Sequence, residues 1–442
     1  MKNLALLLFT LAPCHAAGLA NGVKIGEVSD SSAVLWTRLT RDAEPGNRAD
    51  EWKAGAPNWT VPGIEGKVRF NYYPIGDREK IKSTPWTGVD SDTDFCRQFK
   101  IEGLEPDTRY SFEAQGLVGG RDGAEIRGTF TTAPAPETEK PITFTVSTCQ
   151  EFETRDDKAN GHKIYRSMLD LNPSFFIQTG DTVYYDRKEP KSKNMDLARY
   201  RWGRMYALPF QKALHREIPS YWMHDDHDIT KDDAWPGVGF GDLTWEQGLQ
   251  IWREQIPQSD KPYRTFRWGK NLQIWLPEGR EFRSPNTMED GPEKSILGKE
   301  QWAWLEETMK ASDATFKLYI SATPVVGPDR DSKNDNHANK GYHYEGERLR
   351  KFLSSIPGCF VINGDRHWQY HSIDPETGLN EFGCGASSDA HAGGWNQKDK
   401  RPEHQFLRVK GGFASINVDG NKATFTHHDV DGQPVYTAEM ER

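Results

Sequence analysis

Short apolar runs alternate with segments of helical period over most of the chain, which is typical of an α/β domain. Runs of β-prone residues predict buried strands at 142–146, 174–178, 218–223, 272–276, 316–321 and 359–363. Between them, apolar residues recur every three or four positions, as do Trp302, Leu305 and Met309. This spacing predicts helices at 206–216, 298–309 and 348–353.

A strand–helix–strand unit is predicted between residues 142 and 178. Ile164, Met168 and Leu171 are expected to share one face of its helix. Such a unit requires parallel strands joined by a right-handed crossover. Further along, 327–339 is polar and acidic, and we expect no regular structure there. The last apolar runs, 413–418 and 422–428, predict a β-hairpin.

The N-terminal third has a different, strand-like pattern. Residues 26–37 contain a turn signal between two β-prone runs, and 67–73 alternate apolar and polar side chains. Residues 104–110 resemble the corner before the penultimate strand of a fibronectin type III sandwich, and 128–133 its last strand. We therefore expect a small fibronectin III- or Ig-like β-sandwich at 18–134 that serves as a spacer or packing domain. A proline-rich and charged linker at 135–141 separates it from the α/β domain at 142–442.

The first 17 residues are predicted to be a Sec-type signal peptide. Lys2 precedes an apolar core at 4–11, and small residues at Ala16 and Ala17 offer a cleavage site. This segment is too short to span a membrane, and no other long apolar run follows. We therefore expect an exported soluble protein with no membrane span, in the periplasm or outside the cell.

Charge and cysteine content limit the partners that the protein can bind and the roles that its cysteines can have. Charged residues make up 27% of the 442 residues and the net charge is −9, which argues against a nucleic-acid-binding surface. Cys14 would leave with the signal peptide, and four cysteines remain. Cys359 and Cys384 are a candidate disulfide pair in an exported protein. For Cys149 two interpretations stay open, a metal-binding thiolate and a small buried apolar residue.

Residues able to bind metal follow several predicted strands. Each could belong to a turn or a solvated acidic face, but the pattern recurs along the chain. Because the carboxyl ends of parallel strands share one edge of a sheet, these residues are expected to converge there. They are Cys149, then Asp181 with Tyr184, then Asp226 and His227 within the run from His224 to Asp228, and last Asp365 with His367.

Such a donor set indicates a metal centre that hydrolyses esters. Carboxylates can bridge two ions about 3.5–4 Å apart, which together clamp a phosphate and activate a water. A thiolate and a phenolate favour a transition metal such as ferric iron, whereas oxygen ligands suit calcium or magnesium. We therefore expect a mixed site. The chain contains no Gly-x-Ser-x-Gly elbow and no P-loop.

Four ordered motifs resemble the PhoD-like family of exported alkaline phosphatases and phosphodiesterases in the metallophosphoesterase superfamily. They are Thr148-Cys149-Gln150, residues 180–186 (GDTVYYD), residues 224–228 (HDDHD) and Gly364-Asp365-Arg366-His367. The resemblance covers the chain from about residue 22 to its end. It implies a four-layer αββα catalytic domain behind the small β-sandwich, and a site with Fe³⁺ and one or two Ca²⁺ ions. Other divalent metals are alternatives.

The resemblance also implies roles for single residues. Cys149, Asp181, Tyr184 and Asp365 correspond to iron ligands, Asp181 being shared with calcium, and Asp226 and His367 lie where further ligands are expected. His227 corresponds to the histidine beside the leaving group, a candidate acid or charge stabiliser. Arg280 and Arg283 match an arginine-containing stretch that could orient the phosphate, although salt bridges within the loops are an equal alternative. Glu278 and His224 depart from the family pattern, which has Asp and an apolar or Trp residue there.

The predicted function is therefore an exported, metal-dependent hydrolase of phosphoric esters, either small-molecule or polymeric, that uses a metal-activated hydroxide. One alternative is a related metallohydrolase acting on a sulfate ester or a phospholipid. Another is a non-catalytic exported binding protein, favoured by the β-sandwich and 15 tryptophans. The sequence makes no prediction of oligomeric state.

Overall fold

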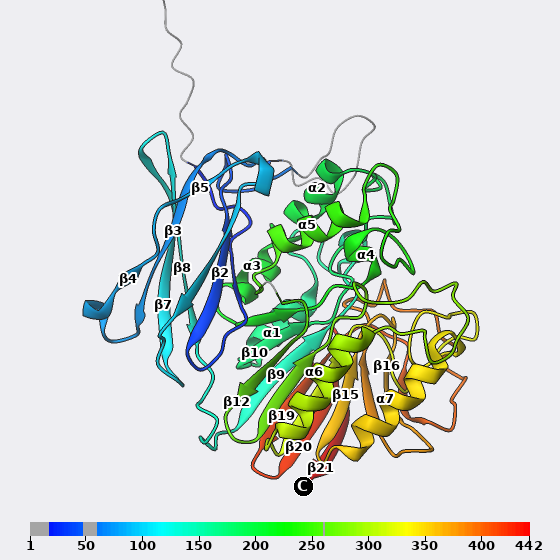
Figure 1. Ribbon diagram of the computed structural model, residues 1–442. Helices are drawn as coiled ribbons and strands as arrows, with labels where there is room; N and C mark the ends of the chain where they lie inside the picture. Colours follow the sequence, from blue (N-terminus) through cyan, green and yellow to red (C-terminus); the bar gives the residue numbers. More distant parts are fainter. Residues whose placement is uncertain (1–16, 47–59, 260) are drawn as a thin grey trace, which may run out of the picture.

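The computed structural model describes residues 17–46, 60–259 and 261–442, and its larger part consists of two β-sheets packed face to face (Figure 1). The first sheet has, in spatial order, β21 (Pro434–Glu441), β20 (Lys422–His428), β19 (Phe413–Asp419), β9 (Ile142–Ser147), β10 (Phe175–Gln178), β11 (Ser220–Trp222), β1 (Val23–Gly26), β2 (Ser32–Arg38) and β6 (Cys96–Glu102). The second has β12 (Arg264–Trp268), β13 (Leu272–Leu276), β14 (Phe316–Ser321), β15 (Cys359–Asn363), β17 (Asn380–Cys384), β16 (Gln369–Ile373) and β18 (His404–Arg408). Both sheets are mixed, with parallel strands at the centre.

Helices cover the outer face of each sheet and complete a four-layer αββα arrangement (Figure 1). On the first sheet these are α1 (Lys163–Asp170) and α3 (Pro209–His215), and on the second α6 (Gly298–Ala311) and α7 (His343–Ser355). Aromatic rings fill the space between the sheets, with the Phe382 and Phe425 centroids 4.2 Å apart and those of Phe175 and Trp268 4.6 Å apart. Burial of this apolar surface is the main force that holds the layers together.

The predicted α/β elements are largely confirmed. Strands β13, β14 and β15 have the predicted bounds, and β9 and β10 pair in parallel on either side of α1. Residues 327–339 contain no helix or strand, and β19 and β20 form the predicted hairpin. The expectation that Leu171 shares a helix face with Ile164 and Met168 is wrong. Helix α1 ends at Asp170, so Leu171 lies beyond its buried face and 39% of it is exposed.

The N-terminal part is rich in β-structure, as predicted. A further sheet packs against β1, β2 and β6, with Phe70 and Phe99 in edge-to-face contact at 5.8 Å. Its strands are β3 (Gly66–Pro74), β4 (Lys82–Ser83), β5 (Thr87–Val89), β7 (Arg109–Val118) and β8 (Arg121–Thr131), with short 3-10 turns η1 (Arg78–Lys80) and η2 (Ser91–Thr93) beside them. The Tyr110 hydroxyl accepts a hydrogen bond from the Glu105 amide at 2.9 Å, which is the corner that residues 104–110 predict.

The N-terminal strands are built into the rest of the molecule. Strand β1 pairs in parallel with β11 at Gly26 and Ser220, so the first sheet runs through both parts of the chain. Side chains of β1, β2 and β6 also reach the end of helix α5 (Trp245–Gln255), whose last carbonyl groups lack partners within the helix. Donors from three strands bond these carbonyls: Gln98 to Arg253, Trp36 to Glu254 at 2.7 Å, and Lys24 to Gln255 at 2.6 Å.

The disulfide predicted between Cys359 and Cys384 is absent. All four cysteines in the described part of the chain are free and buried. Strands β15 and β17 are parallel neighbours, and Cys359 begins one while Cys384 ends the other. The two thiols therefore lie at opposite ends of the strand pair.

The structure also bears on the predicted targeting segment and membrane span. Most of the predicted signal peptide, residues 1–16, lies outside the described residues. Of the helices in the described ranges, none is long and apolar enough to cross a membrane.

Candidate metal centre

The residues predicted to bind metal converge where the two sheets meet at the carboxyl ends of their strands. Cys149 follows β9, Asp181 follows β10 and Asp226 follows β11, while Asp365 and His367 follow β15 in the other sheet. Backbone contacts hold these loops together. The Gln150 amide donates to the Asp181 carbonyl at 2.9 Å, and the Asp365 amide donates to the Thr148 hydroxyl at 3.2 Å.

Three of these residues have left-handed backbone conformations. The φ angles are 50° at Cys149, 53° at Asp181 and 62° at Asp365. Residues other than glycine rarely adopt this region, and cysteine has no local hydrogen bond to favour it as aspartate has. Strain of this kind concentrates at functional sites, where the surrounding structure holds it in place. The three loops are therefore shaped to aim their side chains at a shared position.

Glycines before two of these aspartates permit the close approach of the loops. Gly180 has φ of 108°, and a Cβ there would lie 2.7 Å from the Cβ of Asp225. A Cβ on Gly364 would lie 2.4 Å from the Thr179 hydroxyl oxygen. Both distances are shorter than real carbon contacts, so packing requires glycine at both positions, and the positive φ of Gly180 is a second reason for glycine there.

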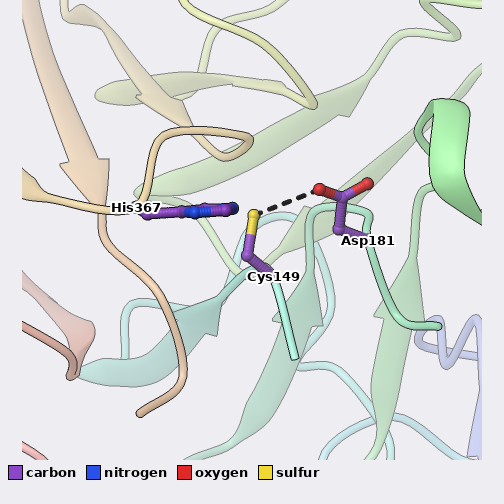
Figure 2. Close-up of side chains that lie close together, drawn as sticks. All are labelled: Cys149, Asp181 and His367. Carbon is purple, nitrogen blue, oxygen red and sulfur yellow. Dashed lines mark hydrogen bonds between the residues drawn. The ribbon is translucent and has the colours of Figure 1, made fainter. Parts of the chain in front are cut away.

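Cys149, Asp181, Tyr184 and His367 form the first group of donors. Figure 2 shows Cys149 between His367 and Asp181, with its sulfur directed at the carboxylate. The Cys149 thiol donates to Asp181 Oδ2 at 3.4 Å. The Tyr184 hydroxyl donates to the same oxygen at 2.9 Å and lies 3.3 Å from His367 Nε2.

Two further groups share Asp181. One contains Asp226 and His227, the other Asp225 and Asp365, and within each group the potential ligand atoms lie within 4.8 Å of one another. Cys149, Asp181 and His367 satisfy the same criterion. Because Asp181 belongs to all three groups, its carboxylate has the position of a ligand that bridges two ions.

The electrostatics of the cluster also favour a cation. Burial and the nearby carboxylates raise the pKa of Asp181 and of the Cys149 thiol well above their usual ranges. Burial, Asp181 and Cys149 likewise raise the pKa of Tyr184. Asp181 Oδ1 is buried with no hydrogen-bond partner among the described residues. Packing several acidic groups against one another is costly without a positive charge, and a metal ion would supply it.

His227 is held beside this cluster by a carboxylate. Its Nδ1 lies 2.6 Å from Asp186 Oδ1, and its ring centroid lies 4.4 Å from that of Tyr184. Burial alone lowers the pKa of His227, but Asp226, Asp181 and the hydrogen bond with Asp186 raise it well above the usual range. The hydrogen bond with Asp186 therefore fixes the orientation of the imidazole.

The run His224 to Asp228 does not act as one set of ligands. Asp225, Asp226 and His227 turn toward the cluster. Asp228 instead accepts hydrogen bonds from the amides of Thr182 and Val183 at 2.7 and 3.0 Å, and so fixes the loop after β10.

His224 turns away from the cluster and lies beside Glu278, the second residue that departs from the family pattern. Its Nε2 lies 3.3 Å from Glu278 and 3.4 Å from Glu281. Burial lowers the pKa of His224, but the two glutamates outweigh this and raise it. His224 and Glu278 are therefore ion-pair partners, and the two departures complement each other.

The two arginines of the 278–283 stretch are both engaged by the protein. Arg280 is fully buried; its guanidinium bonds Asp225 and lies 3.4 Å from Asp335 and 3.8 Å from Asp226. Arg283 donates to the backbone carbonyls of Gly279 and Asp335 at 2.7 and 2.9 Å. In this structure, therefore, Arg280 forms a salt bridge with Asp225 and Arg283 bonds backbone carbonyls.

Sequence reasoning missed two residues at the centre, Arg187 and His391, and it quoted Asp186 and Asp225 within motifs without giving either a role in the site. His391 is nearly buried, with its ring centroid 4.1 Å from that of His367 and 5.1 Å from that of Tyr184. It reaches the site from an irregular loop, so no strand-end pattern marks it. Asp225 stands directly beside Asp226, and the paired aspartates were a signal for it. Arg187 directly follows the 180–186 motif and stacks on Tyr184.

Family profiles match both parts of the chain. The profile of the PhoD-like phosphatase family covers residues 144–420, and that of the PhoD-like phosphatase N-terminal domain covers residues 11–134. Among curated proteins, alkaline phosphatase D of Bacillus subtilis (strain 168) is 25% identical, with 86% of this chain and 70% of that protein covered.

Solved structures show the same fold. A structure of PhoD has a TM-score of 0.75 at 18% identity and covers 96% of this chain and 89% of its own. The purple acid phosphatase PPD1 from yellow lupin (Lupinus luteus) seeds has a TM-score of 0.69 at 11% identity, covering 97% of this chain and 75% of its own. The chain therefore shares its four-layer fold with PhoD and with this purple acid phosphatase.

Proposed function

The chain belongs to the PhoD-like phosphatase family and is a phosphoester hydrolase, and from this premise we propose that its activity depends on a metal centre held by Asp181 and its neighbours. The observation that carries the proposal is that three groups of potential ligands share the Asp181 carboxylate. A bridging carboxylate is what a site for two ions requires.

The donor types divide the ligands between two ions. We assign the thiol of Cys149 and the phenol of Tyr184, with Asp181 and Asp365, to Fe³⁺, since thiolate and phenolate favour a transition metal. Asp226 and His367 would be further ligands, and Asp181 would also help to hold the second ion, for which Ca²⁺ suits the carboxylate oxygens. We add Asp225 to these ligands, because a carboxylate oxygen of Asp225 lies within 4.8 Å of carboxylate oxygens of Asp181 and Asp365. When bound, such ions polarise a phosphoryl group and lower the pKa of water to about 7.

The chain's own residues then have separate tasks. His227, fixed by Asp186, is the candidate to stabilise or protonate the leaving oxygen. Arg280 is better placed to hold Asp225 and Asp226 than to contact substrate, because its guanidinium already faces carboxylates. Asp228 fixes the backbone between Asp181 and Tyr184. We further propose that the protein is exported by the segment at 1–17 and acts on small or polymeric phosphate esters.

The proposal is tested by turnover of p-nitrophenyl phosphate and bis-p-nitrophenyl phosphate before and after chelation. Turnover of at least one ester, lost with chelator and restored by Fe³⁺ with Ca²⁺ rather than by either alone, is the expected result. Turnover that survives removal of all metal would refute the metal-dependent centre. Restoration by Mg²⁺ or Zn²⁺ alone would refute the iron–calcium assignment while leaving the hydrolase intact.

A further inference from the structure

Arg187 is a cation beside the centre that forms no ion pair with any carboxylate in the described part of the chain, although Asp181, Glu151 and Asp186 lie close enough to raise its pKa. It directly follows the motif that carries Asp181 and Tyr184, and it is half-buried. Its guanidinium carbon lies 4.9 Å from the centroid of the Tyr184 ring. Within the described residues, its side chain forms no ion pair and no hydrogen bond to another side chain. The cation–π contact holds the group in place without neutralising its charge.

The contrast with Arg280 shows which arginine is free to bind an anion. Arg280 is fully buried and faces Asp225, Asp226 and Asp335. A guanidinium matched by carboxylates has little remaining capacity for a phosphate. Arg187 keeps its donors, and a planar guanidinium can bond two phosphoryl oxygens at once.

Tyr184 places Arg187 close to the reacting region. The phenol hydroxyl bonds Asp181 and lies near His367, and the same ring contacts His227 and His391. Arg187 therefore stacks on a side chain that touches both the proposed ligands and the proposed leaving-group histidine. Its field also reaches His367 and His391, since the positive charge is one of the causes that lower the pKa of each.

We infer that Arg187 binds a non-bridging oxygen of the substrate phosphate and favours monoesters over diesters; this rests on the proposed hydrolase function. A phosphate monoester carries close to two negative charges above pH 7, because its second pKa is about 6, whereas a diester carries one. A fixed cation attracts the doubly charged group more strongly. Arg187 is thus the residue that sets preference for the monoester and affinity for the phosphate product.

The test compares Arg187→Gln and Arg187→Lys with wild type in the metal-loaded protein. For Arg187→Gln we expect the KM for p-nitrophenyl phosphate and the Kd for inorganic phosphate to rise about tenfold, with a much smaller change for bis-p-nitrophenyl phosphate. Arg187→Lys should recover part of the loss, because the charge remains without the planar fork. Arg69→Gln is the matched control, since Arg69 stacks on Trp86 at 4.6 Å in the N-terminal sheet.

Other outcomes would overturn the inference. Equal losses on both esters, no change on either, or a fall in metal content in Arg187→Gln would mean that Arg187 supports the structure and does not bind the phosphate. Calorimetric titration with inorganic phosphate keeps the test separate from turnover. If wild type hydrolyses neither ester, the proposed function fails, but wild type still has to bind phosphate more tightly than Arg187→Gln for the inference to stand.

Discussion

At the scale of single residues, the centre depends on side chains whose surroundings disfavour their charged forms. Asp181, Cys149 and Tyr184 lie against one another in a buried space, and two of them have left-handed backbone conformations. Such an arrangement is unfavourable by itself and becomes favourable when a cation binds. The residue-level predictions therefore concern metal binding and the backbone geometry that permits it.

Tyr184→Phe is expected to weaken iron binding while leaving the surrounding packing intact. The change removes the phenol oxygen but keeps the ring that contacts His227 and Arg187. We expect iron affinity to fall by at least about tenfold, which is the lower range for loss of even an indirect metal contact. Iron content after dialysis against a weak chelator measures this. Full iron content with full activity would remove Tyr184 from the ligand set.

Gly180→Ala is expected to displace Asp181. The new Cβ would lie 2.7 Å from the Cβ of Asp225, at a φ of 108° that side chains rarely adopt. We expect loss of metal and of most activity, together with destabilisation by more than about 1 kcal/mol. Gly76→Ala is the control, because its φ is 94° but nothing lies within 4 Å of the added carbon. If both variants behave alike, backbone strain rather than the contact with Asp225 is responsible.

At the scale of elements, Glu345 on helix α7 links that helix to α6, to residues 295–296 and to His337. Its carboxylate accepts hydrogen bonds from Trp302 at 2.6 Å, from the Ile296 amide and from the Ser295 hydroxyl, and lies 3.0 Å from His337. Burial alone raises the pKa of Glu345, but these contacts outweigh it and lower the pKa to about 2. The ionised form is therefore the one that stabilises the fold.

Glu345→Gln is expected to lower stability at neutral pH by about 2 kcal/mol, the scale of hydrogen bonds to a charged group. Because the folded pKa lies below the ordinary value of 4.5, the stabilisation is complete above that value and is lost as pH falls toward about 2. The stability difference between variant and wild type should therefore shrink over this range. Urea unfolding at several pH values measures it, and a difference that stays constant or grows as pH falls would contradict the account.

The sequence predicts elements and strand ends well because both follow from local rules. Apolar runs bounded by turn residues locate β13, β14 and β15, and parallel pairing places Asp181 at the carboxyl edge of the first sheet and Asp365 at that of the second. The packing of the two sheets then brings the two carboxylates together. Contacts that depend on long-range packing cannot be predicted from the sequence. His391 arrives from an irregular loop, and Arg280 is paired by Asp335, which is 55 residues away. The disulfide prediction failed because cysteine content gives no information on which strand ends are adjacent.

At the scale of the whole molecule, the N-terminal strands complete the α/β part. Lys24, Trp36 and Gln98 donate to the last carbonyls of α5, and β1 extends the first sheet. Helix α5 packs against α4 (Asp226–Ile229), which carries Asp226 and His227, and against α2 (Met195–Met205). The N-terminal part therefore supports the helix that backs one side of the site.

Lys24→Met is expected to destabilise the whole chain. The Lys24 ammonium group donates to the Gln255 carbonyl and lies 3.7 Å from the ring centroids of both Trp36 and Tyr206. Its loss leaves a buried carbonyl unpaired, at a cost of about 1–3 kcal/mol. Thermal unfolding should show a lower midpoint, with activity at low temperature retained. An unchanged midpoint would mean that this contact does not couple the two parts.

Asp181→Asn removes the carboxylate around which the proposed metal centre is organised, and metal content and turnover are measured on the same samples. Asp313→Asn is the control, since the Asp313 side chain is 91% exposed and far along the chain from the ligands. The account predicts that Asp181→Asn folds, loses both kinds of ion and retains less than about 1% of turnover, a loss in the range expected for removal of a principal stabilising group. Full metal occupancy and turnover close to wild type in Asp181→Asn would contradict it.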